Sequence, residues 1–342
     1  MGMPRQPASM TAVAAGLPAI TVICIEDFMR LFPASAGVAA IALSTAATLA
    51  TPTTAAAQQV TLYGRVDLSI AQRANATDNT ELRNGSGSRF GVRGSEDLGD
   101  GLRAVFGLEH RFDADTGAAG DPFWGGKSVV GLAGSFGTVT LGRDDNPAVK
   151  MVQEAADPWA GDTVAGNGNI YDGNVGSSRY SNTITWRASF GGLGLGAQIA
   201  EGDGLDDRPM NFAISYGSGP LYVALGLDNP GNADDQFTSV MARYTVGGVT
   251  LSALYGTGTD RNDRDVDAWL LALKTKVGGG ELRASYGQRD NEGVADPFKQ
   301  LGVGYHYPLS KRTTVYADLV NVKPVAAGRE QTGWDLGIRH NF

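Results

Sequence analysis

The last twelve residues of the chain, QTGWDLGIRHNF, alternate between apolar and polar side chains. In an extended strand successive side chains point to opposite sides, so this segment has one apolar face and one charged face. The apolar face carries Trp334, Leu336, Ile338 and Phe342, and the charged face carries Asp335, Arg339 and Asn341. A strand of this kind, ending on an aromatic residue, is typical of a barrel with lipid outside and water inside.

The composition narrows the class of protein further. The chain has 342 residues, of which 48 are glycine, about twice the usual share. Because glycine weakens helices, this argues against a helix-rich protein. The formal net charge of −8 argues against a nucleic-acid partner, whose binding surface would normally be basic.

The N-terminal segment, residues 1–57, is predicted to be a signal peptide with an over-long extension. Arg30 supplies a positive region, residues 38–49 are a short apolar stretch, and Ala55 and Ala57 form an A-x-A cleavage site. Glu26 and Asp27 are unusual in a signal, which makes Met29 an alternative start. A membrane anchor helix is the other interpretation, but the apolar stretch is shorter than the roughly 20 residues that a span needs.

Residues 58–342 are predicted to form a single barrel domain without cysteine. The one cysteine, Cys24, lies in the signal segment, so disulfides and thiolate chemistry are excluded from the mature chain. No later segment is apolar for long enough to be a membrane-spanning helix. If the mature chain enters a membrane, only a closed barrel can satisfy its backbone there.

The pattern predicts sixteen strands of about ten residues, the length that a tilted membrane strand needs. They cover residues 60–70, 87–95, 102–112, 126–134, 137–143, 179–189, 194–201, 210–217, 220–228, 236–246, 249–257, 266–276, 280–289, 298–308, 312–322 and 332–342. Short turns alternate with long polar loops, as in outer-membrane barrels. The longest loop is 144–177. Strand 266–276 is ambiguous because Trp269, Leu270 and Leu271 interrupt the alternation.

Strand parity indicates which arginines point into the barrel. An arginine at the lipid midplane costs about 2–4 kcal/mol, so the charged faces should line a wet lumen. The inward set is Arg65, Arg89, Arg93, Arg103, Arg111, Arg179 and Arg339. A soluble β-sandwich is the alternative fold, but it usually has seven to nine strands in about 100 residues.

Several segments resemble the Gram-negative general porin family across the whole mature chain. These are VTLYGRVDLSI (60–70), SRFGVRGSEDLGDGLRAVFGLE (88–109), VVGLAGSFGTVTLGR (129–143), SRYSNTITW (178–186) and the terminal Phe342. The resemblance implies a sixteen-stranded antiparallel transmembrane barrel, all-β, that assembles as a homotrimer and folds its long third loop into the lumen. The function it implies is a water-filled channel for passive diffusion of ions and small hydrophilic solutes.

The resemblance also implies a pore constriction in which a basic wall faces an acidic loop. By resemblance Arg89, Arg93 and Arg179 belong to this wall, and parity adds Arg65 and Arg103. The loop acids are expected to be Asp144, Asp145, Glu154 and Asp157, the last two chosen by their mid-loop position. The alternative is that the arginines only pair with acids of a packed interior, namely Asp67, Glu96, Asp97 and Glu109. The sign of the selectivity stays open.

Phe342 matches the family's C-terminal signal for the outer-membrane assembly machinery. Outer-membrane lipid and lipopolysaccharide are the other expected partners, and no cofactor or metal site is predicted. The alternative function is that of an adhesin or an outer-membrane hydrolase. A hydrolase needs a histidine beside a nucleophile. His110, His306 and His340 lie in no such pattern, and their positions suggest the bilayer rim or turns.

Overall fold

The structure is a computed structural model. Sixteen long strands, in which apolar and polar side chains alternate, form its fold. The structure describes residues 59–74, 80–171, 175–202, 204–205, 207–232, 235–323 and 331–342. The predicted signal peptide, residues 1–57, lies outside the described residues. Within them, no helix is both long and apolar enough to span a bilayer.

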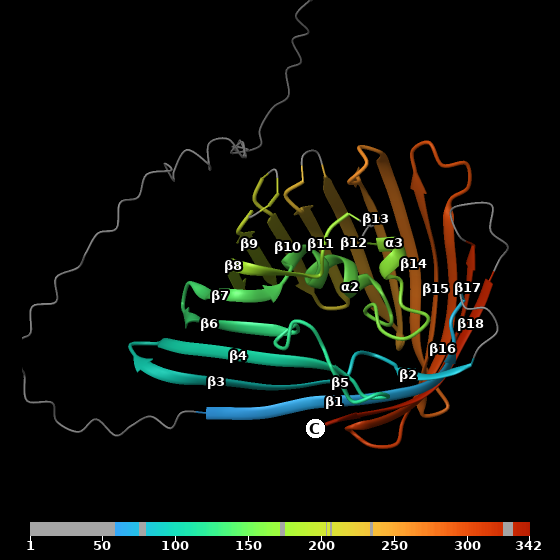
Figure 1. Cartoon of the computed structure of the whole chain (residues 1–342), viewed down its shortest axis with the longest axis horizontal. Helices are drawn as coiled ribbons and strands as arrows, with labels where there is room; N and C mark the ends of the chain where they lie inside the picture. The colour runs from blue at the N-terminus through green and yellow to red at the C-terminus, as the bar shows by residue number, and fades with distance from the viewer. Residues whose placement is uncertain are drawn as a thin grey trace, which may run out of the picture. The chain divides into compact units, whose positions relative to one another are not determined.

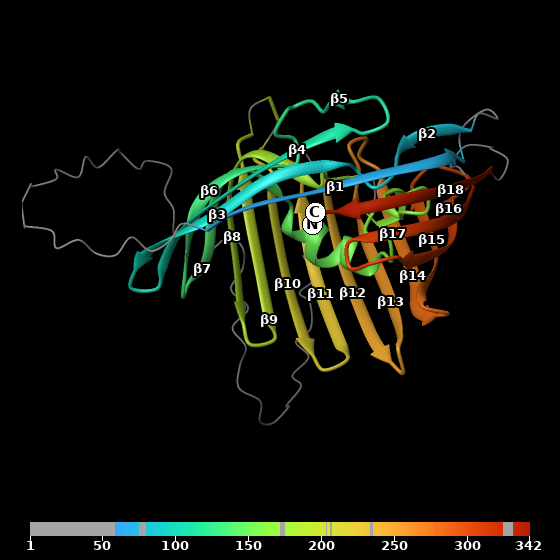
Figure 2. The same cartoon turned by 90° about the horizontal axis from the view of Figure 1, so that it is seen from below.

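The long strands follow one another around a ring, each antiparallel to its neighbours (Figures 1 and 2). They are β1 (Gln59–Gln72), β3 (Arg89–Gly99), β4 (Leu102–Asp113), β6 (Lys127–Gly134), β7 (Gly137–Asp145), β8 (Arg179–Phe190), β9 (Leu193–Ala200), β10 (Met210–Ser218), β11 (Leu221–Asn229), β12 (Gln236–Val246), β13 (Val249–Thr259), β14 (Asp265–Val277), β15 (Gly280–Asn291), β16 (Phe298–Pro308), β17 (Thr313–Lys323) and β18 (Gln331–Asn341). The predicted barrel of sixteen strands is confirmed. Two short additional strands, β2 (Glu81–Asn84) and β5 (Ala118–Ala119), lie inside the predicted loops 71–86 and 113–125.

The ring is closed by the pairing of its first and last strands. β1 and β18 pair antiparallel from Arg65 opposite Asn341 to Gln72 opposite Trp334. Gly64 and Phe342 then exchange two backbone hydrogen bonds of 3.0 and 3.1 Å. The Phe342 ring covers Gly64 so closely that a Cβ there would collide with it, which leaves glycine as the residue that fits. The last residue of the chain is therefore part of the seam.

The two faces of the strands separate as the alternation predicts. In β1, Leu62 is 64% exposed on the outer face, while Asp67 is fully buried on the inner face. In β18, Ile338 is 51% exposed on the outer face and Asp335 is buried on the inner one. The exposed apolar face suits lipid, and charged side chains are directed to the interior.

Glycine turns close the short hairpins at one rim. Gly247 and Gly248 join β12 to β13, and Gly278 and Gly279 join β14 to β15, all with positive φ. Such backbone angles match the twist of a two-residue hairpin and are accessible to glycine. The long connections lie at the other rim, so all the short turns of the barrel are at the same end.

The long connection between β7 and β8 contains three short helical segments, namely η1 (Val149–Gln153), α2 (Glu154–Ala156) and α3 (Gly168–Tyr171). Their apolar side chains pack against the inner faces of β10–β16. The cluster consists of Val152, Ala156, Ile170, Tyr171, Ala213, Ala224, Met241, Leu254, Leu270 and Phe298. Leu270 is fully buried in this contact, which explains why the alternation is interrupted at 269–271.

Truncation of Phe342 should weaken the seam between β1 and β18. Removing a fully buried phenylalanine side chain costs about 3–5 kcal/mol, and this half-exposed ring should contribute less, about 1–2 kcal/mol. We expect Phe342→Ala to lower the fraction of heat-modifiable, folded barrel after refolding into lipid vesicles. Phe136→Ala is the matched control, because Phe136 is equally exposed, at 43%, but lies in a turn. Equal yields from both variants would contradict a role of Phe342 in closure.

Candidate pore constriction

Three arginines stand side by side on the inner wall of the barrel. Arg65 on β1 lies directly opposite Arg89 on β3, and Arg89 lies directly opposite Arg111 on β4. All three side chains are only partly exposed. Like charges placed directly opposite each other across strands are destabilising. The row therefore needs compensating partners, or an anion.

Each arginine of the row has such a partner. Arg65 donates to the carboxylate of Asp162 at 3.0 Å, and Arg111 donates to Glu109 at 2.8 Å. Arg89 donates to two backbone carbonyls of the preceding turn at 2.9 and 3.0 Å, and lies 4.0 Å from Glu109. Pairing with Glu109, one of the interior acids named as the alternative, thus holds for Arg111. Glu109 carries one negative charge, so it compensates only part of the positive charge of the three arginines.

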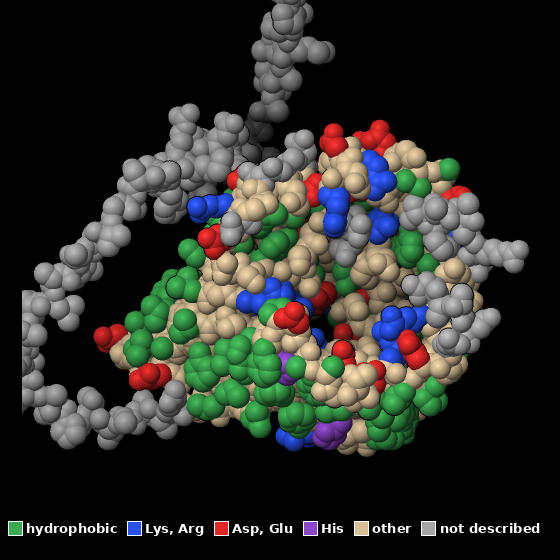
Figure 3. All heavy atoms as spheres, in the orientation of Figure 1, with side chains coloured by type: hydrophobic (Ala, Val, Ile, Leu, Met, Phe, Trp, Pro, Cys, Tyr) green, Lys and Arg blue, Asp and Glu red, His purple; other side chains and the backbone are tan. Residues whose placement is uncertain are grey.

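A cavity of about 370 Å³ lies between this row and the long connection. Its basic lining consists of Arg65, Arg89, Arg111, Lys150 and Arg179, and its acidic lining of Glu154 and Asp162. Figure 3 shows basic and acidic side chains gathered around a central hollow, with apolar side chains covering the outer wall beside it. The lining has five basic and two acidic residues, so its formal charge is positive.

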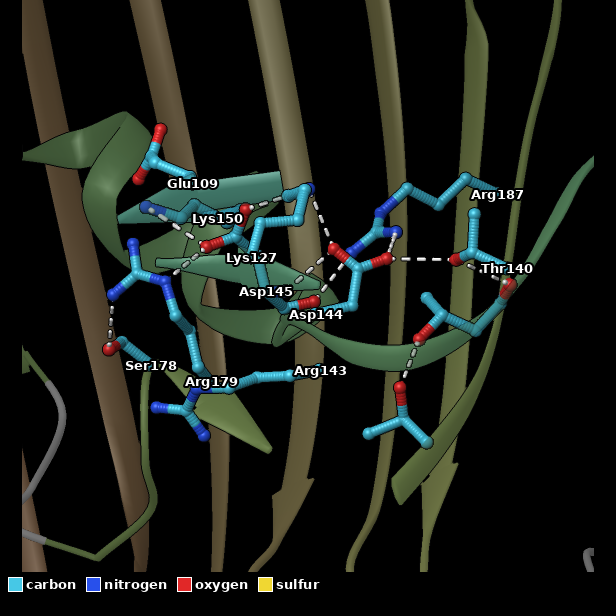
Figure 4. Close-up of polar contacts among 12 residues, drawn as sticks. Glu109, Lys127, Thr140, Arg143, Asp144, Asp145, Lys150, Ser178, Arg179 and Arg187 are labelled. Carbon is cyan, nitrogen blue, oxygen red and sulfur yellow. Dashed lines mark hydrogen bonds and ion pairs between the residues drawn. The ribbon is translucent and has the colours of Figure 1, made fainter. Parts of the chain in front are cut away.

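A second ionic network holds the ends of the long connection (Figure 4). Asp145 lies 2.9 Å from Arg179, 3.3 Å from Lys127 and 3.9 Å from Lys150. These three cations come from β8, β6 and η1. One carboxylate therefore joins both ends of the connection to the wall.

Asp144 is buried beside Asp145 and pairs with two cations. It accepts hydrogen bonds of 2.7 Å from Lys127 and from Arg187, and of 2.9 Å from Thr140. Both aspartates were expected to belong to the loop. The structure instead makes them the last residues of β7, since they continue the pairing with β8 opposite Tyr180 and Arg179.

The two mid-loop acids occupy different environments. Glu154 lines the cavity and accepts from Lys150 at 2.6 Å, and burial raises its pKa despite this cation. Asp157 is buried away from the cavity lining, and burial raises its pKa as well. Its carboxylate accepts from the backbone amides of Trp159, Gly161 and Asn167, and thus shapes the loop.

Asp162 occupies the position that Asp157 was expected to hold. It contacts Arg65 at 3.0 Å at the edge of the cavity, and burial raises its pKa against the lowering effect of Arg65 and Arg89. The sequence shows that Asp162 belongs to the loop, but it does not show that the side chain points toward Arg65. Lys127 and Lys150 were also missed, because neither resembles a family motif: strand pairing brings Lys127 to Asp145, and the loop conformation brings Lys150 there.

Arg93 and Arg103 do not join the arginine row. The guanidinium of Arg93 lies 5.1 Å from the centre of the Tyr63 ring, in an exposed position. Arg103 is exposed near the short turn between β3 and β4, opposite Asp97. Neither residue lines the cavity.

The middle of the long connection is attached to β17 and β18 through buried polar contacts. The indole of Trp159 donates to Asp318 at 2.8 Å, and the backbone amide of Val164 donates to Asp335 at 3.2 Å. His306 also contacts Asp318, at 3.0 Å. His306 lies two residues from the short-turn end of β16, near a rim as expected, and its side chain is buried on the inner face.

The wall of β16 is shaped for this contact. Gly302 and Gly304 face Trp159, and a Cβ at either would come within about 3.3 Å of the indole. Glycine at these two positions therefore leaves the space that the Trp159 ring occupies. The loop and the wall have matching shapes as well as matching hydrogen bonds.

A closed ring of sixteen antiparallel strands, apolar outside and charged inside, defines the class of transmembrane β-barrels. Residues 40–324 match the family model described as Gram-negative porin. The chain belongs to this family, whose members are channels of the outer membrane rather than enzymes, and it is accordingly a passive diffusion channel of that membrane.

Individual relatives agree with this assignment. Outer membrane porin protein 32 of Delftia acidovorans is 32% identical over 84% of this chain and 95% of its own length. An outer membrane porin protein of Bordetella pertussis is 28% identical over 83% of this chain and 94% of its own. The solved structure of the anion-selective porin from Comamonas acidovorans aligns with a TM-score of 0.73, at 27% identity, over 84% of this chain and all of that one.

Neutralising Asp145 should make the cavity more positive. Because this carboxylate serves three cations, we expect Asp145→Asn to raise the permeability ratio of chloride to potassium by about two- to threefold, as estimated for one unit charge in a wet pore. The measurement is the reversal potential under a potassium chloride gradient. Asp100→Asn, in the exposed turn between β3 and β4, should leave the ratio unchanged. A ratio unaffected by Asp145→Asn would place this network outside the ion path.

Proposed function

We propose that this porin prefers anions, and that its selectivity is set where the loop residues 146–178 face the row of Arg65, Arg89 and Arg111. The loop enters the lumen and narrows it, and small hydrophilic anions pass between the loop and the arginines. A pore selects by its diameter and by the charges along its wall. The cavity bounded by these groups would then be the narrow point of the path.

The single observation that carries the proposal is the register of the three arginines. Two successive pairs of like charges stand directly opposite each other, an arrangement that destabilises a sheet. Their compensating acid on the wall, Glu109, is buried at 9% exposure. All three arginines line the cavity and Glu109 does not, so the cavity lining keeps more positive charge than the wall as a whole. The selectivity stated for the relative from Comamonas acidovorans agrees in sign.

The contacts of the loop support its place in the lumen. Its partners Arg65, Asp318 and Asp335 lie on inner faces, opposite to the exposed apolar wall. The acids Glu154 and Asp162 would then oppose the arginine row and produce a transverse field. Such a field favours ions and polar solutes over uncharged apolar ones.

We also propose that three copies assemble into a trimer in the outer membrane, as the resemblance implies. A closed cyclic assembly would bury part of the apolar wall that each barrel exposes. Lipopolysaccharide and lipid would cover the rest. Phe342 would first be read by the assembly machinery and then take its place in the seam.

Planar bilayers test this function directly. Purified mature protein should insert as channels that close in three equal steps, and a potassium chloride gradient should drive the reversal potential toward that of chloride. Arg89→Gln should lower the chloride-to-potassium ratio by about two- to fivefold, because it removes a unit charge from the cavity lining. Arg93→Gln, the matched control, should change it much less. Closed channels, cation preference, or equal effects of the two variants would overturn the proposal.

The loop acids should make the selectivity depend on pH. Since burial raises the pKa values of Glu154 and Asp162, both carboxyls take up protons at a higher pH than exposed carboxyls do. Lowering the pH from neutral into the acid range then removes negative charge from the cavity before exposed carboxyls lose theirs, and the chloride preference should rise. In the double variant Glu154→Gln and Asp162→Asn, the preference should be high already at neutral pH and nearly constant. A pH dependence that persists in this variant would assign the effect to other groups.

A further inference from the structure

A second pair of like charges stands on the inner wall away from the arginine row. Lys274 on β14 lies directly opposite Arg283 on β15. Arg283 is paired with Glu281 at 2.8 Å. Within the described part of the chain, Lys274 forms no hydrogen bond and no ion pair. As in the first row, two cations directly opposite each other destabilise the sheet unless a carboxylate or a bound anion compensates their charge.

Two further arginines interact with this pair. The guanidinium of Arg243 lies 4.7 Å from the centre of the Tyr222 ring and donates to the backbone carbonyl of Ala155 in the loop, at 3.2 Å. Arg339 on β18 has a buried Nε without a hydrogen-bond partner among the described residues. It interacts electrostatically with both Arg65 and Arg283. Arg339 therefore connects the first row to the second group.

The second group lies nearer to the rim of short turns than the first. Arg243, Lys274 and Arg283 are each three residues from the short-turn end of their strands. Arg89, by contrast, is the first residue of β3, at its long-loop end, and Arg339 pairs with Asp67, two residues beyond Arg65 toward the same end. An antiparallel strand rises about 3.4 Å per residue, so the two groups occupy different depths of the barrel.

The acids near the second group are already engaged. Glu281 pairs with Arg283, and Asp157, which interacts with Lys274, is hydrogen-bonded to amides of its own loop. Asp67 and Asp162 interact with Arg339, but they are bonded to Tyr316 and Arg65 respectively. Among the described residues, Lys274 and Arg339 are therefore left without an ion-pair partner of their own, although Glu281 and Asp157 interact with Lys274 at longer range.

We propose that Arg243, Lys274 and Arg283 form a second binding site for small oxyanions, such as inorganic phosphate, between the constriction and the rim of short turns. This inference rests on the proposed anion preference, because the site would receive what the constriction admits. Two sites in series allow an anion to bind at each without being trapped, since occupancy of one favours release from the other.

The experiment measures how inorganic phosphate, added first to one side and then to the other, reduces chloride current through single channels. In the double variant Lys274→Gln and Arg283→Gln, phosphate block from one side should weaken by about five- to tenfold, as expected for the loss of two unit charges at a wet site. Block from the opposite side should change by less than about twofold, because the arginine row is intact.

Two controls separate charge from other effects. Lys311→Gln with Arg312→Gln removes the same charges from the exposed turn after β16, and should leave the block unchanged from both sides. Lys274→Arg with Arg283→Lys keeps the charges and should keep the block. If the double neutral variant does not yield heat-modifiable barrel, the single variants Lys274→Gln and Arg283→Gln replace it, each with a smaller effect in the same direction.

The outcomes distinguish this inference from the proposed function. If the unaltered channel prefers chloride but neutralising Lys274 and Arg283 leaves phosphate block unchanged from both sides, the second site is wrong and the proposed function stands. If the unaltered channel shows no chloride preference, the proposed function fails first. If the turn variant weakens the block as much as the double variant, the effect belongs to the rim and not to a site.

Discussion

The pairing of β1 with β18 is the constraint on which the rest of the structure depends. In lipid an unpaired strand edge leaves backbone amides and carbonyls without partners, so a membrane sheet has to close. Closure gives every strand one face toward lipid and one toward the interior. The exposed Leu62 and the buried Asp67 on the same strand are direct results of this division.

The interior is itself divided into two parts. On the side of β10–β14 the inner face carries an apolar cluster that packs against η1, α2 and α3. On the side of β1, β3 and β4 it carries arginines that no apolar element covers. Because the apolar side of the loop packs against β10–β14, and its Asp162 contacts Arg65, the charged side chains border the remaining space. The position of the loop thus decides which part of the wall stays wet.

Much of this fold could be predicted from the sequence, because alternation and glycine turns are local properties. The sixteen strands and the inward direction of Asp335 needed no knowledge of distant contacts. The interruption at Leu270 could be seen but not interpreted, since its cause is the apolar side of a loop about one hundred residues earlier. Asp157 was selected for its place in the loop, yet its carboxylate is occupied by backbone amides, a contact that depends on the loop conformation.

The constriction was the least predictable part, because it depends on register. Parity states that Arg65 and Arg111 point inward, but only the pairing of β1, β3 and β4 shows that they flank Arg89. The net charge of the chain, −8, is opposite in sign to the formal charge of the cavity lining. These opposite signs do not conflict, because at physiological ionic strength the electrostatic interaction between exposed charges is largely screened beyond about 8 Å. Acids on distant loops have little influence on an ion at the arginine row. In the proposed function, the few residues that register brings together there determine which ions enter.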